Sequence, residues 1–230
     1  MIPGIDGTGK LFYRQIPSLE QRFTVTTTAL RDDARTMDDL VSDLDRHING
    51  LAGHGERVTL FGESFGGALA LSYALAHTER VDRLVILNSF ARFESAASLW
   101  LGCQLLRITP WPLVGLARRI NAPRMHSVRT QPGEIRRFLD LMRSTTREGY
   151  LSRMRILQSY DVADQLAAIT APALFLAADR DTLVPSIEQA IFMSARTPAG
   201  SMRVLEGHGH SCLIAPDMSL ATIIDEWLDR

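Results

Sequence analysis

The segment Gly62-Glu63-Ser64-Phe65-Gly66 places a serine between two glycines, after a short apolar stretch and before an uncharged helical one. A sharp turn from strand to helix forces its central residue into an uncommon backbone conformation, and the glycines remove side chains that would collide across the turn. Ser64 is therefore expected to stand clear of a sheet, where its hydroxyl can attack an acyl carbon. The backbone amide of Phe65, at the start of the following helix, is expected to donate to the developing oxyanion.

A serine hydroxyl is a weak nucleophile until a base takes its proton, so this chemistry needs an acid and then a histidine later in the chain. Two acidic residues, Asp179 and Asp181, open the loop after the apolar stretch Ala173–Ala177. We favour Asp181, because the Val-Pro pair that follows it places it at the apex of the loop. Asp179 is the alternative, and its position nearer the strand end suits a solvated residue or one paired with Arg180.

Two histidines, His208 and His210, lie just after another apolar stretch. We favour His210 as the base, because the small and apolar residues after it suit a side chain held against the next helix. His208 is the alternative, and the glycines on both sides of it indicate a loop residue. Cys212 is expected to be a small packing residue and not a nucleophile. The predicted catalytic set is therefore Ser64, Asp181 and His210.

Short apolar stretches alternate with helical segments, which is the pattern of an α/β protein with a mostly parallel sheet flanked by helices. The predicted strands are residues 23–29, 57–61, 84–87, 173–177 and 202–205. The predicted helices are residues 37–51, 64–77 and 220–228. The acid and the base both follow predicted strands, at positions where strands end.

The alternation stops after Phe90. From residue 94 to residue 160 the sequence has helical pieces interrupted by prolines and no evident strand. This pattern predicts a core formed by residues 1–93 and 161–230, with a helical cap inserted at 94–160. The charges agree with the division, since residues 92–160 carry a net charge of +8 and the remainder carries −9.

The overall composition excludes several classes of protein. Of the 230 residues, 46% are hydrophobic, which is enough to bury a core and excludes a disordered chain. The net charge of −1 gives no bulk attraction for nucleic acid or an anionic membrane. Two cysteines without a metal-ligand pattern, no apparent secretory signal and no apolar run of about 20 residues predict a cytoplasmic protein with no transmembrane segment.

The serine elbow, the acid loop, the histidine loop and the inserted cap together resemble the α/β-hydrolase superfamily, of the serine esterase, lipase or thioesterase type. The N-terminal sequence Pro3-Gly4-Ile5-Asp6-Gly7-Thr8-Gly9 is similar to the H-G-x-x-G-type loop of that family, with proline in place of histidine. Its P-G-x-D-G-T-G form resembles the subgroup that includes plant phytyl ester synthases. By this resemblance the amide of Ile5 is the second oxyanion donor; a turn with a helix cap is the other interpretation of these residues.

The resemblance also implies a buried strand directly before this loop, between the segments predicted as strands 23–29 and 57–61. The sequence begins at the loop itself. We therefore expect either an N-terminally truncated sheet or a sheet that closes around the gap.

Three functions are compatible with these residues. The first is a serine hydrolase of carboxylic esters or thioesters that uses no metal or cofactor. The second is an acyltransferase that passes the acyl group from the same acyl-enzyme to an alcohol. The third is a non-catalytic binding protein with the same fold, for which an incomplete triad would be expected. All three triad positions are filled.

The cap adds two expectations about the substrate. Its apolar stretch from Ala96 to Leu116 predicts side chains that mostly pack on the core and a lining for an apolar acyl chain. Ten arginines lie between Arg118 and Arg155. They are expected either to meet the acidic core and water or to attract an anionic leaving group, such as acyl-CoA or acyl-carrier protein.

Overall fold

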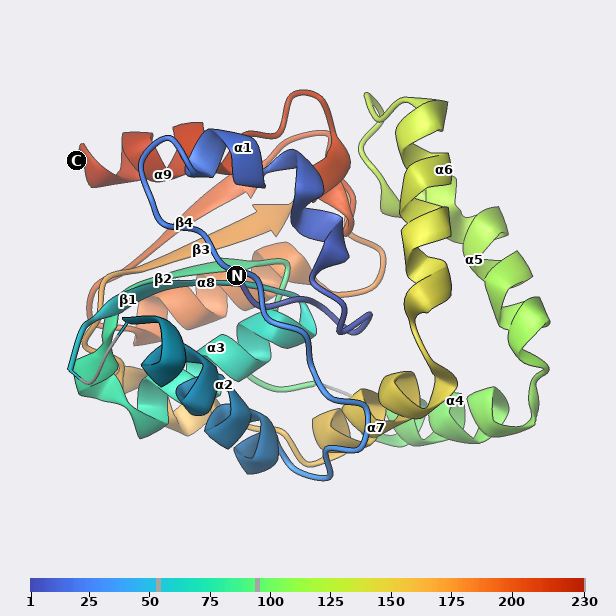
Figure 1. The fold of residues 1–230 in the computed structure, drawn as a ribbon, viewed down its shortest axis with the longest axis horizontal. Helices are drawn as coiled ribbons and strands as arrows, with labels where there is room; N and C mark the ends of the chain where they lie inside the picture. Colours follow the sequence, from blue (N-terminus) through green and yellow to red (C-terminus); the bar gives the residue numbers. More distant parts are fainter. Residues whose placement is uncertain (53–54, 94–95, 230) are drawn as a thin grey trace.

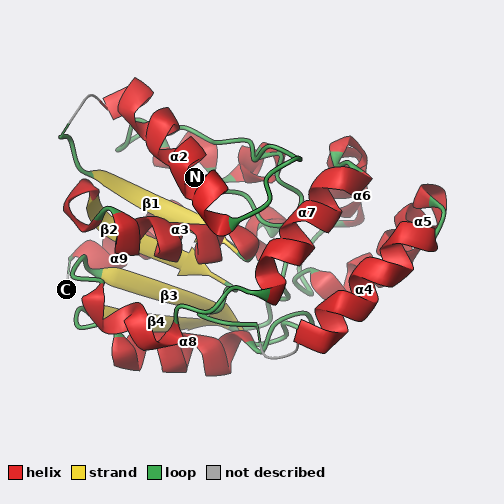
Figure 2. Cartoon of the chain, turned by 90° about the horizontal axis from the view of Figure 1, so that it is seen from below, coloured by secondary structure: helices red, strands yellow, loops and turns green. Residues whose placement is uncertain are grey.

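Four parallel strands form a sheet in the order β1-β2-β3-β4 (Figures 1 and 2). The structure is a computed structural model that describes residues 1–52, 55–93 and 96–229. The strands are Val58–Glu63 (β1), Val81–Leu87 (β2), Ala173–Ala178 (β3) and Gly200–Leu205 (β4). Each begins and ends within three residues of a predicted strand, so the expectation of a mostly parallel sheet is confirmed.

The sheet separates two apolar layers, because helices cover both of its faces (Figure 1). Alternate residues of β2 contribute to each layer: Leu84 and Ile86 pack on the side of α2, α3 and α8, whereas Val85 and Leu87 pack on the side of α1 and α9. The helix bounds are Ile16–Leu19 for α1, Met37–Ala52 for α2, Phe65–Ala76 for α3, Ser186–Arg196 for α8 and Leu220–Leu228 for α9. The three helices predicted in the core are therefore present.

The prediction of a strand at residues 23–29 is wrong. This segment runs extended beside Met1, whose amino group donates to the Thr26 carbonyl at 2.7 Å and whose carbonyl accepts from the Thr28 amide at 3.1 Å. On its other side, Ile2 forms a single parallel bridge to Gly62 of β1. Met1 and Ile2 lie between the segment and the sheet, and the part of the chain that the structure describes gives the segment no neighbouring strand.

The space beyond Met1 is a groove of about 550 Å³. Its lining includes Val25 from the extended segment, Leu60 from β1 and Ile48 from α2. In the described residues the sheet therefore neither continues through residues 23–29 nor closes around the gap.

In the described residues four α-helices lie between β2 and β3 in sequence and stand beside the sheet (Figures 1 and 2), and we refer to them as the cap. They are α4 (Ala96–Ile108), α5 (Trp111–Met125), α6 (Pro132–Leu141) and α7 (Arg147–Gln158). Pro112 and Pro132 lie in the first turns of α5 and α6, where an amide has no partner inside the helix. An isolated antiparallel bridge between Arg92 and Asp161 joins the two ends of this insertion.

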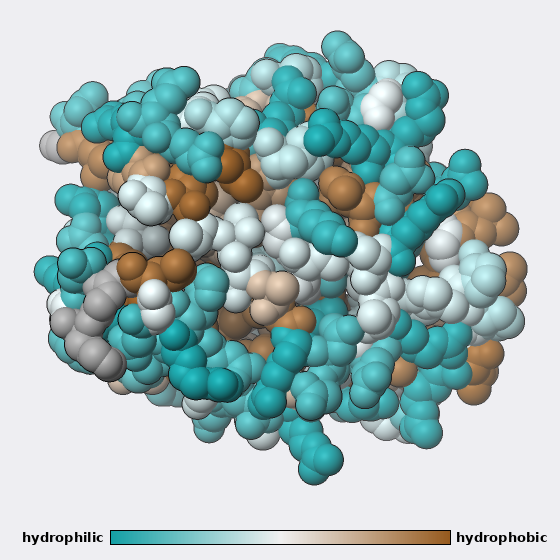
Figure 3. Space-filling model, viewed as in Figure 1, coloured by the Kyte–Doolittle hydropathy of each residue, from teal (hydrophilic) through white to brown (hydrophobic). Residues whose placement is uncertain are grey.

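Many apolar side chains of the cap face outward. Within the described part of α4 and α5, Leu99 is buried, but Trp100 is 55% exposed and Ile108 is 78% exposed. Leu101, Leu105, Leu113 and Leu116 are also exposed, and Figure 3 shows apolar side chains at the outer edge of the cap. The expectation that most of this stretch packs on the core is therefore wrong, because α4 packs against α7 on one side and leaves its other side uncovered. No helix in the described residues combines the length and apolarity needed to cross a membrane.

Candidate active site

Ser64 lies in the turn between β1 and α3, with φ 53° and ψ −118°. This is a strained conformation for a residue with a side chain, and the surrounding structure maintains it. A β-carbon on Gly62 would lie 2.3 Å from the Gly66 carbonyl oxygen, and one on Gly66 would lie 2.3 Å from the Ile2 carbonyl oxygen. Both glycines are therefore required by the close approach of the elbow and the N-terminal strand end.

The loop that carries Ile5 lies against the serine. A β-carbon placed on Gly4 would contact the Ser64 β-carbon at 3.5 Å, and the bridge of Ile2 to Gly62 fixes the start of the loop beside β1. Among the backbone hydrogen bonds of the described residues, none has the amide of Ile5 or Phe65 as its donor. Neither amide is therefore taken up by a carbonyl of a described loop, turn or cap.

Asp181 and His210 form a buried pair at the carboxyl ends of β3 and β4. The distance from His210 Nδ1 to Asp181 Oδ2 is 2.7 Å, and the two side chains are 8% and 1% exposed. Asp181 Oδ1 accepts from the backbone amides of Leu183 (2.9 Å) and Val184 (3.1 Å), and the Ser186 hydroxyl donates to Oδ2. These four donors fix the carboxylate, which in turn fixes the imidazole.

The electrostatics of the pair favour the charged form of each partner. Burial acts to lower the pKa of His210, but the hydrogen bond and charge of Asp181, with the charge of Glu63, outweigh it and raise that pKa. Burial likewise acts to raise the pKa of Asp181, but the bonds from His210, Ser186 and the backbone hold it below the usual value. The site is therefore arranged to stabilise an imidazolium beside a carboxylate.

The two alternative residues lie together elsewhere in the same loops. Asp179 Oδ1 accepts from the backbone amides of Gly207 (2.8 Å) and His208 (3.2 Å). His208 Nε2 lies 3.6 Å from Asp217 Oδ2, and burial lowers the pKa of His208. The structure thus places Asp179 against the backbone of the histidine loop, whereas it joins Asp181 to the imidazole of His210.

Two residues after β2 support the site and were not found from the sequence. Asn88, fully buried with φ 48°, donates to the His210 carbonyl at 2.8 Å and accepts from the Ala178 amide at 2.8 Å. The Ser89 hydroxyl donates to the Ser64 carbonyl at 2.7 Å. These bonds tie the ends of β1, β2 and β3 to the histidine loop. The sequence signal that could have identified them is their position, since both polar residues directly follow a buried strand.

Glu63 places a second buried carboxyl group next to the nucleophile. Burial raises its pKa to about 7; the charge of His210 opposes this shift, and the charges of Asp6 and Asp181 add to it. Glu63 therefore changes its charge near neutral pH, next to a histidine whose pKa is raised.

The two cysteines do not fit a nucleophilic role. Cys212 is fully buried, and burial raises the pKa of its thiol. Burial also raises the pKa of Cys103. In the described ranges, no group of three or more histidine, cysteine, aspartate or glutamate side chains is placed to hold a metal ion.

A mostly parallel sheet with helices on both faces, and a serine at the turn from its edge strand into a helix, defines the fold as that of an α/β hydrolase. The chain belongs to the Hydrolase_4 family of serine aminopeptidase (S33) type, whose family model matches residues 26–217.

Individual proteins agree with this assignment. The chain is 25% identical over 250 residues to a protein of Caulobacter sp. (strain K31) named "Putative carbamate hydrolase RutD", with 96% of this chain and 87% of that protein covered. A thermophilic esterase from Thermogutta terrifontis has a similar structure, with a TM-score of 0.84, 22% identity, and coverage of 99% of this chain and 88% of the esterase. The structure of MenH from S. aureus is also similar, with a TM-score of 0.84 and 17% identity. The match covers 99% of this chain and 91% of MenH. The structural similarities establish the fold.

Proposed function

We propose that this protein is a serine hydrolase of carboxylic esters or thioesters. The observation that carries the proposal is the buried Asp181–His210 pair, which lies in loops at the same edge of the sheet as the strained Ser64. In this reaction the Ser64 hydroxyl oxygen bonds to the acyl carbon while His210 takes its proton. The amides of Ile5 and Phe65 donate to the oxyanion.

In the following steps His210 acts first as an acid and then again as a base. His210 gives its proton to the leaving alcohol or thiol as the bond from the acyl carbon to that group breaks, which leaves an acyl-serine. His210 then takes a proton from water, and the resulting hydroxyl bonds to the acyl carbon. Cleavage of the acyl–serine bond returns the proton to Ser64 and releases the acid. Neither a metal ion nor an organic cofactor has a part in these steps.

The test is turnover of a chromogenic short-chain ester, together with covalent labelling by a fluorophosphonate. Ser64→Ala should abolish both. Ser144→Ala is the matched control, because Ser144 is an exposed serine of the cap, and it should leave both unchanged. Labelling that persists in Ser64→Ala, or a wild-type protein that neither labels nor turns over, would refute the proposal. The latter result would favour a non-catalytic binding protein.

We infer that the acyl group is apolar. Phe65, next to the nucleophile, belongs to the same apolar cluster as Leu99 of the cap, and Ile5 and Met154 pack against it. This support does not depend on the outward-facing residues of α4 and α5. Activity should therefore rise as the acyl chain is lengthened beyond acetyl, and a steady fall over the same series would contradict the inference.

A thioester with an anionic leaving group is the more specific version of the proposed substrate. A cavity of about 480 Å³ in the cap is lined by four arginines and one carboxylate, that of Asp140, which lies 3.5 Å from Arg143. The four arginines are Arg118, Arg119, Arg136 and Arg143. Guanidinium groups bind phosphates with paired hydrogen bonds, so this cavity supports acyl-CoA or acyl-carrier protein as substrate.

Other arginines of the cap support a structural role for part of its charge. Arg129 pairs with Asp217 of the core, and Arg153 pairs with Asp32 at 3.2 Å. Arg137 lies over the Tyr13 ring, 3.7 Å from its centroid. The anionic-substrate proposal therefore depends on the four arginines of the cavity and not on the whole charge of the cap.

Two related reactions can be tested with the same enzyme. An acyltransferase would resolve the acyl-serine with an alcohol, so product analysis in the presence of added alcohols would detect a new ester beside the acid. The RutD relatives are named for carbamate hydrolysis. A chromogenic carbamate assayed beside the matched ester would show whether that chemistry extends to this chain.

A further inference from the structure

Arg153 of α7 is the largest fully buried side chain in the described residues, with 0% of its surface exposed. Its guanidinium extends from the cap to the N-terminal loop. Nε donates to the Ile5 carbonyl at 2.8 Å, Nη2 donates to the Asp6 carbonyl at 3.3 Å, and Nη1 lies 3.2 Å from Asp32 Oδ1. A side chain of the cap thus binds the two successive backbone carbonyls that lie on either side of the Asp6 α-carbon.

The surroundings of Arg153 leave no room for larger neighbours. A β-carbon on Gly7, which has φ 70°, would lie 2.5 Å from Arg153 Cζ. A β-carbon on Gly149 would lie 2.6 Å from Arg153 Nη2 and 1.9 Å from Asp32 Oδ1. The guanidinium reaches the loop because both of these positions are glycine.

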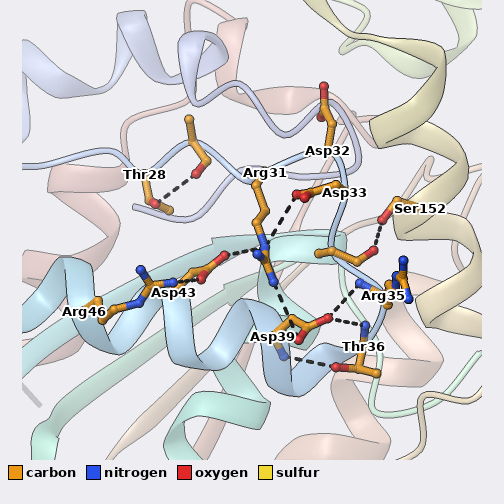
Figure 4. A network of polar contacts seen from close by, with 12 residues as sticks. Thr28, Arg31, Asp32, Asp33, Arg35, Thr36, Asp39, Asp43, Arg46 and Ser152 are labelled. Carbon is orange, nitrogen blue, oxygen red and sulfur yellow. Dashed lines mark hydrogen bonds and ion pairs between the residues drawn. The ribbon is translucent and has the colours of Figure 1, made fainter.

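Asp32 is in turn held in place for this contact. The Thr146 hydroxyl donates to Asp32 Oδ2 at 2.6 Å. Asp33, Asp39 and Asp43 gather around Arg31, whereas Asp32 points away from that group (Figure 4).

A second bond joins the same segment to α7, since the Ser152 hydroxyl donates to the Ala34 carbonyl (Figure 4). The segment before α2, the cap helix α7 and the N-terminal loop therefore meet at the guanidinium of Arg153.

Burial of the Arg153 charge costs free energy, and a side chain that only filled the space would not have this cost. Burial lowers the pKa of Arg153, and the charge and hydrogen bond of Asp32, with the charge of Asp6, oppose that shift. An apolar side chain of similar volume would fill the space without removing a charge from water. Such a side chain could not bind two carbonyl groups in fixed directions, and this difference points to a directional role.

We propose that Arg153 is a positioning residue for the oxyanion hole. By binding the carbonyls of Ile5 and Asp6, it fixes the two peptide planes that follow Ile5. It thereby holds the part of the loop from which the Ile5 amide is directed toward the substrate oxygen. The turn bond from the Gly7 amide to the Gly4 carbonyl (3.0 Å) closes the loop, and Arg153 binds the two carbonyls between these glycines, those of Ile5 and Asp6. The inference rests on the proposed function, in which the Ile5 amide is an oxyanion donor. Because α7 carries Arg153, it also links the position of the cap to the geometry of the hole.

Arg153→Lys and Arg153→Ala test the proposal, and the same substitutions at Arg147 are the matched controls. Arg147 lies on the same helix and also donates to two carbonyls, those of Arg107 (2.9 Å) and Thr109 (2.6 Å), but both belong to the cap. Loss of one oxyanion donor lowers kcat by about 10²–10³-fold. The Arg153 variants should lose activity on that scale in kcat with little change in KM, and the Arg147 variants should not.

Two further measurements separate positioning from a general loss of structure. Guanidinium ion at non-denaturing concentrations should restore part of the activity of Arg153→Ala and none to an Arg147→Ala protein. A boronic acid inhibitor, which forms an anionic adduct with the serine, should bind Arg153→Lys more weakly than wild type. Equal kcat and equal boronate affinity in Arg153→Lys and Arg147→Lys would overturn the assignment.

Amide hydrogen exchange of residues 4–7 distinguishes failure of this inference from failure of the proposed function. Exchange in Arg153→Lys should be faster than in wild type and in Arg147→Lys, whether or not a substrate has been found. Unchanged exchange would overturn the role of Arg153 even in an active enzyme. Faster exchange in a protein without Ser64-dependent chemistry would support Arg153 as the restraint on the loop and refute the hydrolase proposal alone.

Discussion

Replacement of Asp181 by asparagine should change the tautomer of His210 without changing the fold. Asp181 Oδ1 accepts from the amides of Leu183 and Val184, so the carbonyl oxygen of an asparagine would take that position. Its NH₂ group would then face His210 Nδ1 and force that nitrogen to act as an acceptor. The proton of the neutral imidazole would move to Nε2, which could no longer accept a proton from the Ser64 hydroxyl.

We expect kcat to fall in Asp181→Asn, because the tautomer of His210 that can accept the Ser64 proton is no longer formed. A change of this kind in a serine triad lowers kcat by about 10⁴-fold, which corresponds to about 5 kcal/mol of transition-state stabilisation. The assay is kcat for a chromogenic ester at a pH where His210 is neutral, with circular dichroism and a thermal melt to verify the fold.

Asp179→Asn is the matched control. Asp179 lies in the same loop and accepts from two backbone amides, those of Gly207 and His208, but does not contact the His210 ring. An asparagine carbonyl can keep these bonds, so kcat should stay near that of wild type. Retention of more than about a tenth of kcat by Asp181→Asn, or an equal loss in Asp179→Asn, would refute the reasoning.

Three further predictions concern pH, salt and stability. Glu63→Gln removes a charge that raises the pKa of His210, so the acidic limb of the kcat/KM profile should move to lower pH; an unmoved limb would contradict this role. Joint replacement of Arg119 and Arg136 by Gln should abolish the extra salt sensitivity of acyl-CoA hydrolysis relative to a neutral ester, measured as the Debye length shrinks from about 30 Å to about 8 Å. Asn88→Ala leaves a buried carbonyl and a buried amide without partners, so urea denaturation should show a loss of about 2–4 kcal/mol, and a loss below about 1 kcal/mol would argue against it.

The sequence predicted the strands of the sheet well because parallel strands are buried on both faces. Every residue of β3 is buried, so the apolar stretch is continuous and its bounds are sharp. Residues 23–29 are rich in threonine and valine, which also favours a strand, but a strand needs a neighbour over its length. Propensity cannot supply that neighbour, and within the described residues the backbone of this segment bonds to Met1 and Leu19 and to no strand.

The sequence could propose Ser64, Asp181 and His210 because each follows a strand and has a local signal of its own. Asn88 and Arg153 were missed for the opposite reason. Asn88 binds a carbonyl 122 residues away, and Arg153 binds one 148 residues away. In sequence each is one polar residue among many, and only the folded chain shows which backbone groups it meets. The outward apolar face of the cap was missed because hydrophobicity predicts burial whether or not a neighbour is present to provide it.

The opposite charges of the cap and the core meet at loops that carry the proposed site. Arg129 pairs with Asp217, which also lies beside His208, but this contact is solvent-exposed and contributes only about 0–1 kcal/mol. The contact of Arg153 is buried and fixed in direction, and it ends on the carbonyl of Ile5. A displacement of α7 would therefore reach the Ile5 loop directly, whereas no hydrogen bond among the described residues joins α4 or α5 to that loop. It follows that cap substitutions should alter kcat when they move α7 and leave it unchanged when they move only the outer helices.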